Sequence, residues 1–140
     1  MSQVQEQTTS KPSTRLKAIL LLGNDDATML PLAHVLSQDL HFHLFVASNG
    51  FAAVKFVRHI TPHLLIVDHC LPDMTGLQLY DYLHANRELA ALPAIMLLSA
   101  SLNNMKDALI ARNLIGFSKP FDLDEVITTI ETIFAASSYE

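Results

Sequence analysis

The apolar run from Leu64 to Val67, which ends at Asp68, constrains the fold of this chain more than any other stretch. Apolar residues that do not alternate with polar ones are typical of strands covered on both faces, and such strands occur mostly in parallel sheets with helices on either side. Asp68 then lies at the carboxyl edge, where open α/β sheets bind their ligands. Pro72 and Gly76 mark a turn before the next helix. The sequence therefore predicts a central parallel strand with a functional aspartate at its end.

A strand followed by a helix is the repeating pattern of the chain from Leu16 onward. The other predicted strands are Lys17–Leu22, Phe42–Ala47, Ala94–Leu98 and Ile115–Ser118. The first helix is predicted to be capped by Asp25 or Asp26 and to run through Gln38. Further helices are predicted from Gly50 to before Pro62, at about Leu77–Asn86 and Asn104–Asn113, and from a cap at Asp122 to about residue 135. Alternating units joined by right-handed crossovers predict a doubly wound α/β fold. We expect a five-stranded parallel sheet in the flavodoxin-like order 2-1-3-4-5, with helices on both faces.

The two ends of the chain differ in composition from its centre. Residues 1–14 are rich in Ser, Thr and Gln and carry almost no apolar side chain that could offset the entropy of ordering. We expect a flexible tail there, with a short strand-pairing arm as the alternative. One folded domain is expected over residues 15–136, followed by a C-terminal tail of residues 137–140.

The composition excludes several classes of partner. Nine Lys and Arg residues, scattered along a chain with a formal charge of −5, argue against nucleic-acid binding. No apolar run approaches the ~20 residues that cross a bilayer, and the N-terminal segment lacks the apolar core of a signal peptide. The single cysteine, Cys70, cannot form an intrachain disulfide, which fits a reducing compartment. We therefore expect a cytoplasmic protein that binds neither nucleic acid nor a membrane.

Polar residues follow four of the predicted strands and should meet at one edge of the sheet. They are Asn24, Asp25, Asp68, Ser99 and Lys119. Two carboxylates that lie close together repel unless a cation separates them, and oxygen donors of this kind suit Mg²⁺, with Mn²⁺ as a close substitute. The sequence predicts a divalent-metal site that includes Asp25 and Asp68.

The segment from Pro62 to Gly76, Pro-His-Leu-Leu-Ile-Val-Asp-His-Cys-Leu-Pro-Asp-Met-Thr-Gly, closely resembles the phosphoacceptor strand and loop of bacterial response-regulator receiver domains. The resemblance covers roughly residues 16–135. It implies that Asp68 is the phosphoacceptor and that Asp25, Asp68 and the backbone carbonyl of Cys70 bind the metal. It also implies that Ser99 and Lys119 contact the phosphoryl group, and that Ser99 and Phe117 act as the switch residues.

Two departures from the family pattern are visible. Asn24 stands at the first position of the usual acidic pair, which leaves Asp25 at the second and should weaken Mg²⁺ binding. For Asp26 we expect a helix-capping role. The segment from Ser99 to Lys119 is shorter than usual by about two residues, so Phe117 stands nearer to Lys119. An interaction module that no longer needs phosphorylation is therefore the alternative function.

The resemblance also implies the partners. We expect a sensor histidine kinase or phosphotransfer protein as the donor and, because only a short tail follows the last helix, a separate output protein; a homodimer is a further option. We do not expect an enzyme beyond self-catalysed phosphoryl transfer and autodephosphorylation. An aspartate-dependent phosphatase of the haloacid dehalogenase kind is disfavoured, because such an enzyme carries a second aspartate where this chain has Cys70.

Two further predictions concern single residue types. Asp73 should be a turn residue whose side chain bonds to its own backbone. The seven histidines show no ligand spacing, so no transition-metal site is expected.

Overall fold

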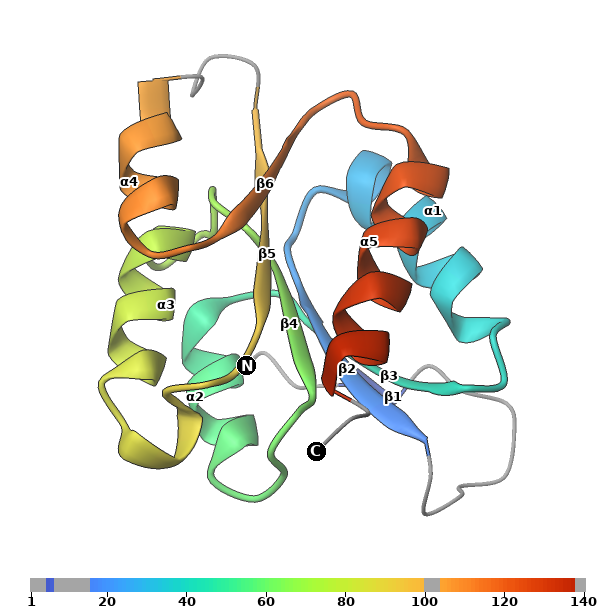
Figure 1. The fold of residues 1–140 in the computed structure, drawn as a ribbon, viewed down its shortest axis with the longest axis horizontal. Coiled ribbons are helices and arrows are strands. Elements are labelled where there is room, and N and C mark those ends of the chain that lie inside the picture. The colour runs from blue at the N-terminus through green and yellow to red at the C-terminus, as the bar shows by residue number, and fades with distance from the viewer. Residues whose placement is uncertain (1–4, 7–15, 100–103, 138–140) are drawn as a thin grey trace.

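The protein is described by a computed structural model, which covers residues 5–6, 16–99 and 104–137. Five parallel strands form the centre of the sheet: β2 (Lys17–Leu22), β3 (Phe42–Ala47), β4 (Leu64–Asp68), β5 (Ala94–Leu98) and β6 (Ile115–Ser118). They lie in the order β3-β2-β4-β5-β6. Counted along the chain, this is the predicted order 2-1-3-4-5, and the predicted fold class is confirmed (Figure 1).

A sixth strand lies at the edge of the sheet. β1 (Gln5–Glu6) pairs antiparallel with β3, with Gln5 opposite Val46 and Glu6 opposite Phe45. The strand-pairing arm considered as an alternative thus exists at these two residues. Main-chain pairing with an open sheet edge needs no apolar side chain, which is why composition did not favour it. The other residues of the expected tail, like residues 138–140, lie outside the described residues.

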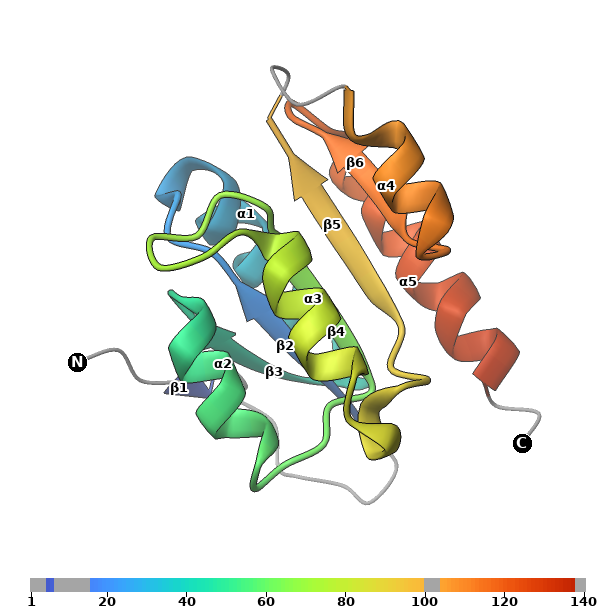
Figure 2. The same cartoon turned by 90° about the vertical axis from the view of Figure 1, so that its left-hand side faces the viewer.

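Two layers of helices enclose the sheet. The helices are α1 (Asp26–Ser37), α2 (Gly50–Val57), α3 (Gly76–His84), α4 (Lys106–Ala111) and α5 (Leu123–Ser137), with a 3-10 turn at Arg87–Leu89. α1 and α5 cover one face, and α2, α3 and α4 cover the other (Figures 1 and 2). Of these helices, none has the length and apolar character that a membrane crossing requires.

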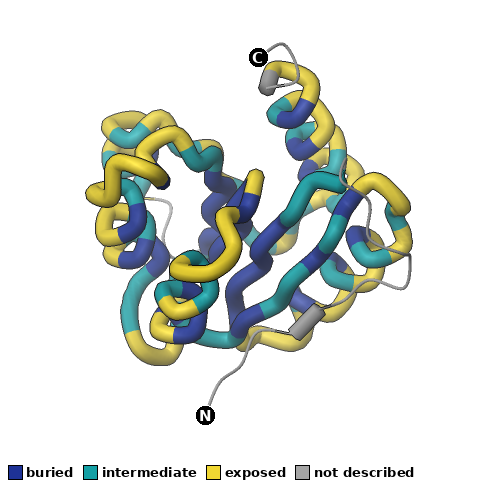
Figure 3. Tube along the Cα trace, turned by 90° about the horizontal axis from the view of Figure 1, so that it is seen from below, coloured by how far each residue is buried: buried dark blue, intermediate teal, exposed yellow. Residues whose placement is uncertain are grey.

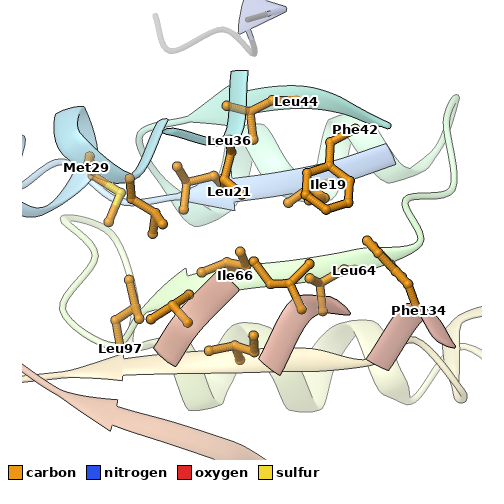
Figure 4. Packing of buried hydrophobic residues seen from close by; sticks show 14 residues of the cluster. Ile19, Leu21, Met29, Leu36, Phe42, Leu44, Leu64, Ile66, Leu97 and Phe134 are labelled. Atoms are coloured by element: carbon orange, nitrogen blue, oxygen red, sulfur yellow. The ribbon is translucent and has the colours of Figure 1, made fainter. Parts of the chain in front are cut away.

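Each face of the sheet carries its own apolar core, because successive side chains of a strand point to opposite faces. On β4, Leu64 and Ile66 join the cluster under α1 and α5, whereas Leu65 and Val67 join the cluster under α2, α3 and α4. Figure 4 shows side chains of the first cluster between the strands and α5. All four residues are fully buried, and exposed residues lie on the outer sides of the helices (Figure 3). The unbroken apolar run of β4 is thus explained by burial on both faces.

Three helices are shorter than predicted. α2 ends at Val57, so Ile60, which the predicted helix included, lies beyond it and is 41% exposed. α3 ends at His84, before the predicted Asn86. α4 has six residues and no side-chain cap at its start, consistent with the shortened segment before Lys119. Arg112, at its end, makes two hydrogen bonds to the carboxylate of Asp81 on α3, at 2.8 and 2.9 Å.

Candidate functional site

The carboxyl ends of the parallel strands form one rim, at the upper side of Figure 1. Asn24 and Asp25 follow β2, Asp68 ends β4, Ser99 follows β5 and Lys119 follows β6. β2 and β5 both pair with β4, so the Asp68 side chain is flanked by two strand ends. Residues far apart in sequence therefore come together because each ends an adjacent parallel strand.

Lys119 contacts both carboxylates of the rim. Its Nζ donates to Asp68 Oδ2 at 2.6 Å and to Asp25 Oδ2 at 3.3 Å. The Asp68 side chain is 2% exposed, compared with 19% for Lys119 and 46% for Asp25. A carboxylate this deeply buried requires a cationic partner, and Lys119 supplies it. The structure thus brings Asp25, Asp68 and Lys119 into one cluster.

Asp25 also caps a helix. Its Oδ1 accepts from the N–H of Ala27 at 3.2 Å, and its Oδ2 accepts from the Thr28 hydroxyl at 2.9 Å. The cap of α1 is therefore Asp25, one of the two residues predicted to cap this helix. The preference for Asp26 as the capping residue is wrong, because Asp26 is the first residue of the helix itself. An N-cap needs extended backbone angles, which Asp25 has (φ −91°, ψ 100°).

The contacts of the cluster shift two pKa values in opposite directions. Hydrogen bonds from Thr28 and then Lys119 hold the pKa of Asp25 below its ordinary value. Burial alone would lower the pKa of Lys119, but the hydrogen bonds and charges of Asp68 and Asp25 outweigh it and raise that pKa. The Asp25 carboxylate and the Lys119 ammonium are both charged at neutral pH.

Residues 69–75, called here the acceptor loop, fold back over the end of β4. The Cys70 N–H donates to Asp68 Oδ1 at 3.0 Å, so each oxygen of the Asp68 carboxylate accepts one hydrogen bond. Cys70 and Thr75 form an antiparallel bridge, and the Gly76 N–H donates to the His69 carbonyl at 2.7 Å. A Cβ on Gly76 would stand 2.9 Å from the His69 Cα, so glycine permits this close return of the chain.

The family of this chain follows from its sequence. The sequence matches the family profile of the response regulator receiver domain over residues 19–131. The chain belongs to this family. The resemblance noted from the acceptor strand and loop is therefore confirmed, and the chain is a signalling module rather than an enzyme in the usual sense.

Relatives of this receiver domain occur within larger proteins. It is 25% identical over 123 residues to the hybrid signal transduction histidine kinase D of Dictyostelium discoideum, a match that covers 86% of this chain and 8% of that protein. It is 26% identical over 117 residues to the probable transcriptional regulator ycf29 of Pyropia yezoensis, covering 83% and 53%. The chain thus spans about half or less of these relatives.

Solved structures show the same fold. The signal receiver domain of an HD domain-containing protein from Pseudomonas fluorescens Pf-5 has a TM-score of 0.77 and 22% identity, and the match covers 93% of this chain and 95% of that one. This likeness supports the architecture and, at this identity, carries no residue roles.

Asp73 is a residue whose role the sequence did not reveal. It was expected to bond to its own backbone, which is wrong: its carboxylate accepts from the N–H groups of Gly50 and Phe51, both at 2.9 Å. These are the first two residues of α2. Local turn chemistry could not predict a partner 22 or 23 residues away, because that contact depends on how α2 and α3 pack.

The remaining predicted site residues lie at or near the rim. Ser99 is half-buried directly after β5, and Asn24 is exposed directly before Asp25. Phe117 packs with the cluster under α1 and α5, and its ring centroid is 6.4 Å from that of Phe121. Their roles in phosphoryl contact, metal binding and switching stay predictions.

The donor set at the rim fits Mg²⁺, which receiver domains typically bind. The oxygens of Asp25, Asp68, Asn24 and the Cys70 carbonyl are hard donors of the kind that this ion prefers. Asp25 Oδ1 and both oxygens of Asp68 each accept one hydrogen bond from the protein, which leaves a lone pair on each. Among the described residues no group of three or more His, Cys, Asp or Glu is placed to hold a metal. An ion here would therefore rest on two carboxylates, other oxygens and water.

Proposed function

We propose that this receiver domain accepts a phosphoryl group on Asp68 from a phosphohistidine of a sensor histidine kinase or phosphotransfer protein. The observation that carries the proposal is the position of Lys119, whose ammonium group bonds to the buried Asp68 carboxylate at 2.6 Å and to Asp25 at 3.3 Å. A fixed cation beside an acceptor carboxylate is what phosphoryl transfer requires, because negative charge spreads over the transferred group.

In the proposed step, an oxygen of Asp68 attacks phosphorus in line with the bond to the donor imidazole. The new P–O bond forms while the P–N bond breaks, and the imidazole leaves with the electron pair and takes a proton from water. The product is an acyl phosphate on Asp68. A bound Mg²⁺ would neutralise charge on the phosphoryl oxygens, held by Asp25, Asp68, the Cys70 carbonyl and, less strongly, Asn24.

Lys119 must change partner during this step. Its amine covers Asp68 Oδ2, so the arriving phosphoryl group competes with the carboxylate for the same ammonium. The raised pKa of Lys119 keeps the amine protonated throughout. In this proposal the hydroxyl of Ser99, a half-buried residue directly after β5, donates to a phosphoryl oxygen.

Output follows from the added charge. An acyl phosphate adds about one to two negative charges at the rim, by analogy with phosphoserine. The surface formed by α4, β6 and α5, which includes Phe117, is the proposed output surface. It would contact a separate output protein or a second copy of this chain.

Asn24 and the use of Asp25 as a helix cap favour a second candidate, a receiver-like interaction module that signals without phosphorylation. Asn24 removes one anionic ligand, and the Asp25 carboxylate already has three hydrogen-bond donors. Both features weaken the case for a strong Mg²⁺ site.

A direct phosphorylation assay separates the two candidates. We expect the protein, incubated with Mg²⁺ and acetyl phosphate, to gain the mass of one phosphoryl group. Asp68→Asn should abolish the gain, because an amide oxygen is a poor nucleophile, whereas Asp107→Asn on the exposed side of α4 should retain it. A wild-type protein that gains no mass at saturating Mg²⁺ supports the interaction module. Continuous turnover of phosphate esters would instead indicate a phosphatase.

A further inference from the structure

The acceptor loop is fastened to the start of α2 by Asp73. Asp73 Oδ1 accepts from the Gly50 N–H and Oδ2 accepts from the Phe51 N–H, both at 2.9 Å. The first N–H groups of a helix have no partner within the helix and carry partial positive charge, so a carboxylate bonds to them strongly. Figure 2 shows the loop between β4 and α3 reaching the start of α2.

A second contact joins the same two segments. The Met74 side chain lies against Gly50, where a Cβ would collide with its sulfur and terminal methyl group. Gly50 is buried, and Met74 packs with the cluster under α2, α3 and α4. The loop is therefore attached to α2 by a pair of charge-assisted hydrogen bonds and by an adjacent apolar contact.

The other end of the loop contacts the acceptor. The Cys70 N–H donates to Asp68 Oδ1, and the bridge between Cys70 and Thr75 joins the two sides of the loop. Asp73 is two residues from Thr75 and three from Cys70, so a displacement at Asp73 is transmitted to the Cys70 main chain. α2 thus serves as a fixed point for the backbone that lies on the Asp68 carboxylate.

We propose that Asp73 is a positioning residue for phosphoryl acceptance: by bonding to the start of α2, it holds the Cys70 main chain in place over Asp68. This inference rests on the proposed function. Without the Asp73 carboxylate, the Gly50 and Phe51 N–H groups bond to water, and only the apolar contact of Met74 still joins the loop to α2. The Cys70 N–H then spends less time bonded to Asp68 Oδ1, and the Cys70 carbonyl spends less time where it would bind the metal.

The matched control is Asn49, which caps the same helix from the residue directly before it. Its side chain accepts from the Ala52 N–H at 2.8 Å. Asn49→Ala and Asp73→Ala should therefore both weaken the start of α2, but Asp73→Ala also removes the two hydrogen bonds that join α2 to the loop. Asp73→Asn offers one acceptor oxygen to the two N–H groups and should give an intermediate result.

Two measurements test the proposal. With acetyl phosphate and Mg²⁺, we expect Asp73→Ala to slow phosphorylation of Asp68 by about tenfold, the size of effect seen when a residue that orients site groups without contacting the substrate is lost. We expect the phosphorylation rate of Asn49→Ala to stay within about twofold of wild type. Without any phosphoryl donor, we expect amide hydrogen exchange in residues 69–71 to accelerate in Asp73→Ala and not in Asn49→Ala.

The outcomes separate the two proposals. If wild type is phosphorylated and Asp73→Ala reacts no more slowly than Asn49→Ala, the positioning role is overturned while the proposed function stands. Unchanged exchange in residues 69–71 of Asp73→Ala also overturns it. If wild type takes up no phosphoryl group, the proposed function fails and the positioning role fails with it, whatever the exchange rates are.

Discussion

Among single residues, Lys119 matters most at the rim, because its ammonium group compensates the charge of the two carboxylates. Asp68 is the one buried charged side chain among those described, and Lys119 lies between it and Asp25. Two neighbouring carboxylates would repel, and one of them would also be desolvated. Lys119 therefore stabilises the folded protein as well as serving the proposed chemistry.

Replacing Lys119 should destabilise the fold. Lys119→Ala leaves the buried Asp68 carboxylate with the Cys70 N–H alone, so we expect the free energy of unfolding to fall by about 1 to 3 kcal/mol, measured by urea denaturation. In an Asp68→Asn background the same replacement should cost clearly less, because no buried charge is left unpaired. An equal cost in both backgrounds would mean that Lys119 acts through packing and not through its charge.

At the scale of elements, the strands of the sheet are also joined at the amino edge, opposite the rim. The ring Nδ1 of His63 accepts from the main-chain N–H of Ala18 in β2 at 2.9 Å. The main-chain N–H of His63 donates to the Ala18 carbonyl at 2.8 Å. Since Nδ1 must be unprotonated to accept, this contact requires a neutral imidazole ring. Burial, and then the charge of Lys17, lower the pKa of His63 accordingly.

This contact predicts a pH dependence of stability. A histidine whose folded pKa is lowered contributes stability above its unfolded pKa of about 6.5, and this contribution is lost as the pH falls from there through the folded value. We expect the urea concentration at the midpoint of unfolding to decrease as the pH is lowered below about 6.5. His63→Asn, which offers a non-titrating acceptor at the position of Nδ1, should show a weaker fall, and His59→Asn should follow wild type. If His63→Asn follows wild type as well, His63 does not cause the pH dependence.

At the scale of the whole molecule, β1 covers part of an open edge of the sheet. β3 is the last of the parallel strands, and Gln5–Glu6 pairs with Phe45 and Val46 on its outer side. An uncovered strand edge offers unpaired N–H and C=O groups to other chains. We therefore expect β1 to protect the receiver domain from edge-to-edge association.

Removing the arm should promote self-association. We expect deletion of residues 1–15 to raise the average mass at high protein concentration relative to the full chain, measured by sedimentation velocity. Replacing both Gln5 and Glu6 with Pro keeps the length of the arm but blocks pairing, and should act in the same direction. If both variants keep the mass of the full chain over the whole concentration range, pairing of β1 has no protective role.

The order of strands and helices, and the residues at the strand ends, can be read from the amino-acid pattern alone. Both follow from local patterns: the unbroken apolar run of β4 reports burial on two faces, and parallel strands of adjacent units must end at one rim. The sequence alone therefore predicts that Asp25, Asp68 and Lys119 lie together at one rim. The same local patterns predict the presence of a helix better than its length, since α2 and α4 are both shorter than predicted.

The hydrogen-bond partners of individual polar groups depend instead on how the elements pack. Asp25 and Asp26 are equivalent as sequence, and the backbone angles at the end of β2 select Asp25 as the cap. Asp73 resembles an ordinary turn residue until α2 is packed beside the acceptor loop, and Gln5–Glu6 has no strand pattern until the edge of β3 is available. The physical reason is that hydrogen bonds between distant segments depend on the relative positions of whole elements, which short-range periodicity does not encode.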